Sequence, residues 1–234
     1  MANIVRPLPD LALAPDYYCE PRIVDGRPTT IYEIWEKGGA YADSITPSTY
    51  SPDYRHHIVD KVVAWTKRGS TVFSLGCGNG FVEAELIGHC RKVRAMDRND
   101  EAVRLCAAKG VQAVRMEFFD LSAADLSDVD LIYADGLLGH LFRLPDGLAA
   151  FADKLRSVAL RPGTVVAISN DAPRDRSAAF SPHDRLDDFW FLSKSYLAAA
   201  LTAADLLLQE SYYFPYTRPL SGLRLRAICI ARAA

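Results

Sequence analysis

The sequence predicts an α/β fold in which helices cover both faces of a mostly parallel sheet, and three observations lead to this prediction. An apolar run at 72–75 leads through a glycine-rich turn directly into an amphipathic segment at 81–89, as a buried strand, a tight loop and a helix would. Further strand-like runs then alternate with helical segments along the chain. The 234 residues, of which 50% are hydrophobic and 24% charged, suffice for one globular domain with a full core.

The glycine-rich turn reads Gly76-Cys77-Gly78-Asn79-Gly80. Glycines at alternate positions let the backbone turn sharply and approach a ligand closely, because no Cβ stands in the way. We expect the N-terminus of the following helix to present free N–H groups to polar atoms of that ligand. A small side chain fits at Cys77, which we interpret as space-filling. The alternative interpretation is a glycine-rich turn without a ligand.

The spacing of these glycines distinguishes between nucleotide ligands. The dinucleotide fingerprint is G-x-G-x-x-G, whereas here the third glycine comes one residue early and Phe81 occupies its place. The pattern G-x-G-x-G after a strand instead resembles motif I of the class I, Rossmann-like S-adenosylmethionine-dependent methyltransferases. The resemblance extends from about Tyr41 to the C-terminus. It implies a seven-stranded, mostly parallel sheet with a C-terminal antiparallel hairpin, and S-adenosylmethionine as the cofactor, bound by Gly76, Cys77, Gly78 and Gly80.

One position departs from the pattern of this family. Motif I usually has an acid two residues before its first glycine, where it orders the loop and helps hold the ammonium group of the donor. Here that position is Ser74. We therefore expect the task of this acid to pass to Asp135 or Glu83.

The first 50 residues precede the nucleotide-binding fold and are rich in aromatic side chains. They could simply pack against an edge of the sheet. The resemblance favours an N-terminal helical lid over residues 1–50, followed by a single methyltransferase domain over 51–234. Tyr41 and Tyr54 resemble the tyrosines that hold the donor carboxylate in small-molecule N-methyltransferases, while Tyr18 and Trp35 are candidates for the acceptor side.

A helix is predicted to begin at Ser51-Pro52, with serine as the N-cap and proline in the first helical position. Apolar residues at helical spacing, including Ile58 and Val62, form its buried stripe. We expect Gly69 to end this helix.

The second strand of the sheet is expected at 92–96, ending at Asp97. A carboxylate at this place, about 20 residues after the first glycine, can accept hydrogen bonds from a ribose diol. We therefore assign Asp97, with Arg98 beside it, to the cofactor site. The alternative is that Asp97 caps the next helix, but Asn99 or Asp100 fits the cap better.

The third strand is expected at 111–116. In the family that the chain resembles, an acid or amide near the adenine amino group follows this strand. Glu117 takes this position here, with the backbone N–H of Phe118 beside it, and Asp120 is the alternative. The aromatic pair at 118–119 could also form an apolar wall for the adenine ring.

The fourth strand is expected at 129–134, followed by Asp135 and the stretch Gly139-His140-Leu141. Ligands of open α/β sheets bind outside the carboxyl ends of the strands, so this segment should flank the same crevice as motif I. The segment is similar to the S-x-x-G-H-L stretch of aminosugar and other small-molecule N-methyltransferases. This implies that Asp135 faces the methionine end of the donor and that His140 faces the acceptor, where it is the best candidate for a general base. Alternatively, His140 hydrogen-bonds its own loop.

The remaining segments complete the fold. We expect a helix at 145–160, a strand at 164–169, an irregular stretch at 170–192, a helix from Ser193 to about Ala204, and strands at 206–214 and 223–231 that form the hairpin. Tyr216 and Arg218 are expected in the turn of this hairpin. The candidates for contact with the acceptor are Tyr18, Trp35, His140, Arg143, His183, Trp190 and Tyr216.

The prediction is an S-adenosylmethionine-dependent methyltransferase that acts on a nitrogen or oxygen of a small molecule, in specialised-metabolite biosynthesis. The segment after the fourth strand lacks the N-P-P-Y type signature of enzymes that methylate adenine or glutamine amides, which disfavours nucleic-acid and protein acceptors. One alternative is a nicotinamide-dependent oxidoreductase, which the position of Gly80 disfavours. The other is a non-catalytic binding module with the same fold, which Ser74 alone suggests.

Composition and charge argue against several other classes of protein. The formal net charge of -2 gives no support for nucleic-acid binding, and the sequence has no apolar run long enough to cross a membrane. The N-terminus lacks the features of a secretion signal, so we expect a cytoplasmic protein. The five cysteines are odd in number and lack C-x-x-C spacing, so we expect neither a metal site nor a disulfide framework. The oligomeric state is not evident from the sequence.

Overall fold

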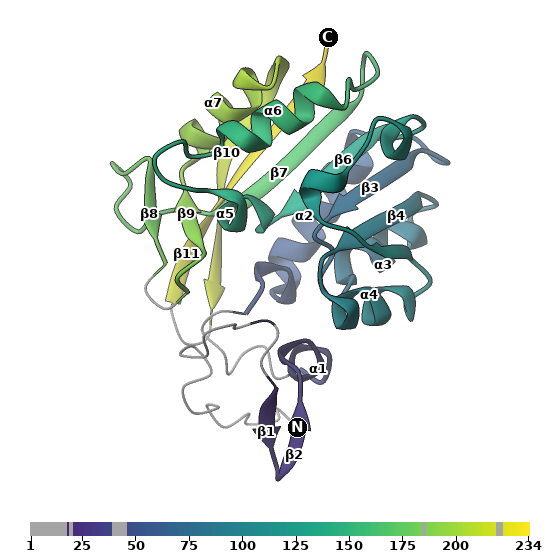
Figure 1. Cartoon of the computed structure of the whole chain (residues 1–234), viewed down its shortest axis with the longest axis vertical. Coiled ribbons are helices and arrows are strands. Elements are labelled where there is room, and N and C mark those ends of the chain that lie inside the picture. The colour runs from purple at the N-terminus through teal and green to yellow at the C-terminus, as the bar shows by residue number, and fades with distance from the viewer. Residues whose placement is uncertain (1–17, 19–20, 39–45, 184–185, 219–221) are drawn as a thin grey trace.

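A seven-stranded sheet forms the centre of the computed structural model, which describes residues 18, 21–38, 46–183, 186–218 and 222–234 (Figure 1). The strand order is β10-β11-β7-β6-β3-β4-β5. The strands from β7 to β5 pair in parallel, whereas β11 and β10 are antiparallel. The strands are β3 (Thr71–Leu75), β4 (Lys92–Asp97), β5 (Gln112–Arg115), β6 (Leu131–Asp135), β7 (Val165–Asp171), β10 (Leu206–Arg218) and β11 (Gly222–Ala233). The predicted sheet with its C-terminal hairpin is confirmed.

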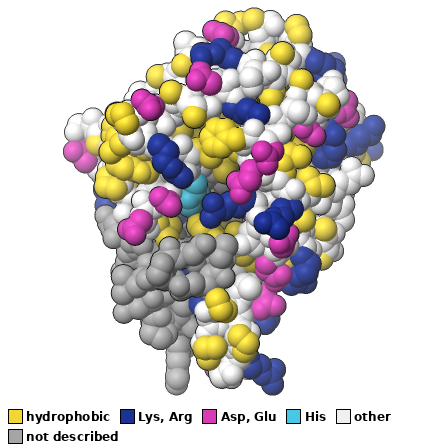
Figure 2. All heavy atoms as spheres, viewed as in Figure 1, with side chains coloured by type: hydrophobic (Ala, Val, Ile, Leu, Met, Phe, Trp, Pro, Cys, Tyr) yellow, Lys and Arg dark blue, Asp and Glu magenta, His cyan; other side chains and the backbone are white. Residues whose placement is uncertain are grey.

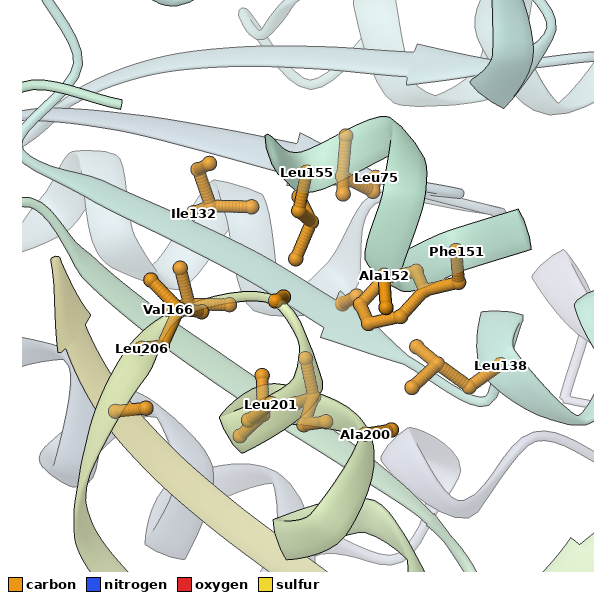
Figure 3. Close-up of a cluster of buried hydrophobic side chains, with 14 of the residues drawn as sticks. Leu75, Ile132, Leu138, Phe151, Ala152, Leu155, Val166, Ala200, Leu201 and Leu206 are labelled. Atoms are coloured by element: carbon orange, nitrogen blue, oxygen red, sulfur yellow. The ribbon is translucent and has the colours of Figure 1, made fainter. Parts of the chain in front are cut away.

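Helices pack on both faces of this sheet. One face is covered by α2, α3 and α4, and the other by α5, α6 and α7. Figure 3 shows residues of the second layer, such as Leu155 of α6, beside Ile132 of the sheet. The helices are α2 (Pro52–Ala64), α3 (Phe81–Gly88), α4 (Asp100–Ala107), α5 (Leu137–Leu141), α6 (Ala149–Ser157) and α7 (Lys194–Ala203).

Burial on both faces explains why the central strands are mostly apolar. Successive residues of a strand point to opposite faces, so Val72 joins the core under α2 and α3 while Phe73 joins the core under α6 and α7. Leu131 and Ile132 in β6 divide in the same way. A parallel sheet covered by helices on both faces therefore has mostly apolar central strands, and polar exceptions such as Ser74 of β3 and Asp171 of β7 lie toward the carboxyl ends of their strands.

Local capping sets several helix boundaries. Asn99 caps α4, because its Oδ1 accepts hydrogen bonds from the N–H groups of Glu101 and Ala102. Ser193 caps α7 by accepting from the N–H of Tyr196. Both caps agree with the predictions. Ser51 precedes α2 as expected but makes no side-chain cap bond, and α2 ends at Ala64, before Gly69.

Two segments differ from expectation. The helix expected from residue 145 begins only at Ala149, because Arg143 and Gly147 close a turn through reciprocal backbone hydrogen bonds. The stretch 170–192 was expected to be irregular, but it contains a short antiparallel pair, β8 (Phe180–Pro182) and β9 (Trp190–Leu192).

The described part of the N-terminal segment is a small hairpin followed by a helix rather than helices alone. The elements are β1 (Arg22–Val24), β2 (Arg27–Thr29) and α1 (Ile31–Glu36), which lie at one end of the molecule in Figure 1. Trp35 and Ile31 of α1 are buried with Leu105 of α4 and Phe189. This packing places α1 against α4.

Two further properties concern contact with membranes and with charged partners: the apolar character of the helices and the distribution of surface charge. Among the residues that the structure describes, no helix combines the length and the apolar character needed to cross a bilayer. Figure 2 shows acidic and basic side chains interspersed over one face of the described residues, without a continuous band of one sign.

Candidate functional site

A cavity of about 590 Å³ opens at the carboxyl ends of β3, β4 and β6. Gly76, Asp97 and Asp135, which stand at the ends of these three strands, all line it. The chain connections change direction between β3 and β6, and ligands of open α/β sheets bind at such a switch in strand order. The place that the sequence predicted for the site is therefore hollow in the structure.

The glycine turn at the end of β3 is held in a left-handed backbone conformation. Gly76, Gly78 and Gly80 have φ values of +73°, +51° and +76°. The N–H groups of Gly76 and Cys77 both donate to the carbonyl of Met96, and that of Gly80 donates to the carbonyl of Cys77. These three N–H groups are therefore engaged within the protein, whereas the prediction of free N–H groups concerns the first residues of the following helix, α3. The turn offers shape and close approach rather than the array of donors that a pyrophosphate requires.

The glycines of the turn differ in the space around them. A Cβ at Gly80 would lie 2.5 Å from the Sγ and 2.9 Å from the Cα of Cys106, so this glycine lets α4 pack closely. A Cβ at Gly78 would meet nothing within 4 Å. Cys77 is buried, and its contact with Cys106 and its burial raise the pKa of its thiol, which keeps it protonated. This supports the interpretation of Cys77 as space-filling.

Substituting Gly80 by alanine should cost about 2–5 kcal/mol of unfolding free energy. The left-handed conformation costs an L-residue about 1–2 kcal/mol, and overpacking against the Cys106 backbone adds about 1–3 kcal/mol. Gly78→Ala is the matched control, because it carries the conformational cost without the clash. Urea unfolding of the three proteins measures the difference, and equal losses in both variants would contradict the packing role.

Asp97 ties the glycine turn to the end of β4. Its Oδ2 accepts a hydrogen bond of 2.9 Å from the N–H of Gly78, and its Oδ1 accepts one of 3.0 Å from the N–H of Asn99. The side chain is 8% exposed and lines the cavity, and burial raises its pKa. Because Asn99 caps α4, Asp97 is not the helix cap. Arg98 also lines the cavity.

A buried acid of α3 lies beside Ser74, the position at which motif I usually has an acid. The hydroxyl of Ser74 donates a hydrogen bond of 2.6 Å to Oε1 of Glu83, and both residues are buried. Glu83 lines the cavity, and burial raises its pKa to about 7. Of the two replacements expected for the missing acid, Glu83 therefore occupies the position directly beside Ser74.

The raised pKa of Glu83 has a consequence for stability. Unfolding returns the carboxyl to its ordinary pKa of 4.5, so the folded protein loses stability as pH rises from about 4.5 to above 7. The loss attributable to Glu83 should reach about 3 kcal/mol. Glu83→Gln has no carboxyl at this position and should lack this pH-dependent loss. The unfolding free energy of the wild-type protein should therefore fall relative to that of Glu83→Gln as pH rises over this interval. A constant difference from pH 4.5 to 8 would contradict the assignment.

The wall expected to contact adenine is only partly as predicted. Glu117 is exposed at the rim of the cavity, whereas its alternative, Asp120, is not among the lining residues. Phe118 lines the cavity, but its ring is 3% exposed and stacks on Phe151 of the core. The aromatic side chain available to a ligand is Phe119, which is 50% exposed.

Asp135 lines the cavity, but its charge is already paired. The carboxylate forms an ion pair with Arg226 and accepts hydrogen bonds from the hydroxyls of Tyr54 and Ser169. Tyr54 is fully buried and is not among the lining residues, so its predicted contact with the donor carboxylate is wrong. Asp135 is consequently less suited than Glu83 to receive the donor's ammonium group.

A second buried group of charges adjoins the first. Asp171 pairs with Arg218 at 3.1 Å and with Arg226 at 3.5 Å, and it accepts a hydrogen bond of 2.7 Å from the hydroxyl of Tyr216. Tyr216 and Arg218 belong to β10 and not to the hairpin turn, because this strand continues to residue 218. Tyr216 is 4% exposed and does not line the cavity, so it is not positioned to contact an acceptor.

His140 connects two segments across the cavity. Its Nδ1 lies 3.1 Å from the backbone oxygen of Asp188, and its Nε2 lies 3.0 Å from the hydroxyl of Tyr18. A carbonyl can only accept, so the Nδ1 carries the proton and the Nε2 lone pair accepts from Tyr18. Burial, assisted by Arg98 and Arg143, lowers the pKa of His140 to about 4. The imidazole is therefore neutral at pH 7, and it bonds to distant segments rather than to its own loop.

The other candidates for the acceptor side divide into two groups. Tyr18, Trp35, Arg143 and His183 line the cavity. Trp190 does not line it, because its ring packs against Phe142 at 4.6 Å and against Phe180. Tyr41 lies outside the described residues.

The described side chains show no metal centre. Within the described ranges, no three His, Cys, Asp or Glu residues come together as a metal site would require. Cys77, Cys90, Cys106 and Cys229 are free thiols.

Sequence reasoning missed the arginines of β11. Arg226 neutralises Asp135 and Asp171, and Arg224 lines the cavity beside it. The signal available in the sequence was the alternation Leu223-Arg224-Leu225-Arg226 at the start of a strand that is otherwise apolar. Charged residues at every second position of a buried strand place their charges on one face.

A curated relative matches nearly the whole chain. The tabtoxin biosynthesis enzyme of Pseudomonas amygdali pv. tabaci is 52% identical over 222 residues, which cover 95% of this chain and 88% of that protein. A family model described as methionine biosynthesis protein MetW matches residues 55–133, which include the glycine turn and Asp97.

Solved methyltransferase structures match the fold at low sequence identity. A 1,6-didemethyltoxoflavin-N1-methyltransferase from Burkholderia thailandensis, solved with 1,6-didemethyltoxoflavin and S-adenosylhomocysteine, has a TM-score of 0.62 at 20% identity and covers 92% of this chain and 99% of its own. A SAM-dependent methyltransferase from Methanosarcina mazei has a TM-score of 0.61 at 15% identity, with coverage of 74% and 96%. The chain thus has the class I, Rossmann-like methyltransferase fold and belongs to the family of the tabtoxin biosynthesis enzyme.

Proposed function

We propose that this protein transfers a methyl group from S-adenosylmethionine to a nitrogen or oxygen atom of a small molecule in specialised-metabolite biosynthesis. The observation that carries the proposal is the cavity at the ends of β3, β4 and β6. There the glycine turn leaves open space at Gly78, and the carboxylate of Asp97 both fixes the turn and faces the cavity. The biosynthetic role of the 52% identical relative supports the choice of a small-molecule pathway.

The residues of the cavity suit the separate parts of the methyl donor. Asp97 can accept hydrogen bonds from a ribose diol, and Glu117 with Phe119 borders the space available to adenine. Glu83 supplies a carboxylate for the donor's ammonium group beneath the turn. With its pKa near 7, Glu83 ionises readily when a cation approaches.

S-adenosylmethionine supplies an electrophilic methyl carbon on a positively charged sulfur, which becomes neutral on transfer. The lone pair of the acceptor atom forms the new bond to carbon while the carbon–sulfur bond breaks and its electrons return to sulfur. The protein's principal contribution is to hold the reacting atoms in line. An acceptor that carries a proton must also lose it. His140 of α5 lines the cavity, and its Nε2, which accepts from the Tyr18 hydroxyl, is the basic atom that would take this proton once the acceptor displaces Tyr18.

The internally bonded turn disfavours the oxidoreductase alternative. Dinucleotide sites hold a pyrophosphate with backbone N–H groups of the glycine-rich turn as well as those of the helix N-terminus behind it. Here Gly76, Cys77, Gly78 and Gly80 already donate within the protein. A ligand without phosphate, such as S-adenosylmethionine, needs no such donors.

Calorimetric titration with S-adenosylmethionine, S-adenosylhomocysteine and NAD in parallel tests the proposal. Micromolar binding of the two sulfur ligands without NAD binding is the expected result. Release of S-adenosylhomocysteine in the presence of small amines and phenols would then demonstrate transfer. Binding of NAD alone would establish the oxidoreductase instead, while donor binding without turnover on any acceptor would favour the non-catalytic binding module.

A further inference from the structure

The guanidinium of Arg224 is buried at the cavity without a carboxylate of its own. The residue is 9% exposed and lines the cavity, and neither its Nε nor its Nη1 has a hydrogen-bond partner. Its contact is a cation–π interaction with Phe191, at 5.1 Å from the ring centroid. Burial without full hydrogen bonding is costly for a charged group, and it lowers the pKa of Arg224. A buried guanidinium with unsatisfied donors is arranged to receive an anion.

The surrounding charges leave Arg224 as the surplus cation. Asp135 pairs with Arg226, and Asp171 pairs with both Arg218 and Arg226. Two carboxylates therefore face three arginines in this part of the cavity. Arg174, which is exposed, adds a further positive charge near Arg224. The local excess of positive charge is not balanced by any described acid that pairs with Arg224.

Strand register explains how these groups converge. Arg226 pairs with Asp171 of β7, and Arg224 pairs with Tyr216 of β10. Residues two apart in a strand share a face, so Arg224 lies on the same face as Arg226, one step beyond the carboxyl end of β7. The strand β11 is separated from β3 by β7 and β6, which corresponds to about 14 Å across the sheet. Arg224 consequently lies away from the glycine turn, on the side of the cavity left for the acceptor.

We propose that the methyl acceptor carries a carboxylate and that Arg224 binds it. The inference rests on the proposed methyl transfer and specifies its substrate class. A guanidinium presents a planar fork of donors that matches the two oxygens of a carboxylate. Among these groups that line the cavity, three arginines against two carboxylates leave one surplus positive charge, which suits a single negative charge, whereas a phosphate dianion would lie unbalanced beside Asp171.

The test begins with the donor product. S-adenosylhomocysteine is titrated into the wild-type protein and into Arg224→Gln, and equal affinities are expected. If the wild-type protein does not bind S-adenosylhomocysteine, the proposed function fails, and this inference fails with it. If only the variant loses affinity, tenfold or more, Arg224 holds the carboxylate of the donor. That result would overturn the inference but leave the proposed function standing.

The second step uses acetate as the carboxylate probe and acetamide as its neutral isostere. Each is titrated into protein saturated with S-adenosylhomocysteine and followed through the methyl NMR signal of the probe. Acetate should bind the wild-type protein, and Arg224→Gln should weaken its binding at least tenfold, which corresponds to about 1.4 kcal/mol. Acetamide should bind neither protein. Arg174→Gln is the matched control, because it removes a nearby charge that does not line the cavity, and it should leave acetate binding unchanged.

Three results would overturn the inference. In the first, acetate does not bind the wild-type protein at any concentration reached. In the second, acetate binds Arg224→Gln as tightly as it binds the wild-type protein. In the third, acetamide binds the wild-type protein as tightly as acetate does. Inorganic phosphate is titrated as a further probe, and tighter binding of phosphate than of acetate would reject the carboxylate. Retained binding of S-adenosylhomocysteine by Arg224→Gln shows that the variant is folded, so a loss of acetate binding has a local cause.

Discussion

Replacing His140 by alanine should lower turnover by about 10²-fold or more while leaving the affinity for S-adenosylmethionine nearly unchanged. A positioned general base contributes about 10²–10⁴-fold to a reaction in which the acceptor loses a proton. The loss of turnover should fall near the low end of this range, because burial lowers the pKa of His140 to about 4 and makes the imidazole a weak base. Single-turnover rates and calorimetric donor titration measure the two quantities separately. His56→Ala, an exposed histidine on α2, is the matched control.

The pH profile adds a sharper test of this role. The neutral imidazole is the active form, so the part of the rate that depends on His140 should be constant above about pH 5 and should fall as pH drops through about 4. An acid limb near 6.5 would contradict the lowered pKa. His140→Gln can still bond to Tyr18 or to the Asp188 carbonyl but cannot act as a base. Full activity in His140→Gln would mean that His140 only positions these two segments.

Replacing Asp97 by alanine should weaken donor binding by at least tenfold, about 1.4 kcal/mol. Two effects combine in this variant. The ribose loses its acceptor, and the glycine turn loses the hydrogen bond between Gly78 and Asp97 that holds it to β4. Calorimetric titration with S-adenosylhomocysteine measures the loss. Asp100→Ala removes an exposed carboxylate three residues away and should leave the affinity unchanged.

Asp97→Asn separates the two effects. The amide keeps one oxygen, which can accept either from the Gly78 N–H or from a ribose hydroxyl but cannot do everything that the carboxylate does. We expect an affinity between those of the wild-type protein and Asp97→Ala. If Asp97→Ala bound the donor as tightly as the wild-type protein, Asp97 would have to be removed from the ribose site.

The parts of the site that local sequence determines were predictable. The glycine turn, Asp97 and the strand ends each follow from a short pattern, because a turn needs particular residues and a buried strand needs an apolar run. The caps at Asn99 and Ser193 follow from the same kind of local rule. These predictions needed no knowledge of how distant segments meet.

The parts that depend on distant contacts were not predictable. The pairing of Asp135 with Arg226 joins residues on different strands, and it removes the charge that made Asp135 a candidate for the donor's ammonium group. Tyr216 was expected in a turn because nothing in the local sequence shows that β10 continues beyond residue 214. Trp190 was assigned to the acceptor because an aromatic residue in a loop has no local sign of its packing partners.

The two halves of the cavity are built in different ways, and this bears on how acceptor choice can diverge within the fold. The donor half is fixed by hydrogen bonds between the β3 turn and β4, from the N–H groups of Gly76 and Cys77 to the Met96 carbonyl and from that of Gly78 to the Asp97 carboxylate. The acceptor half is joined by side chains, with His140 linking Tyr18 to the segment around Asp188 and Arg224 projecting from β11. Substitutions in the acceptor half can therefore change which acceptor binds while the contacts of the donor half stay the same.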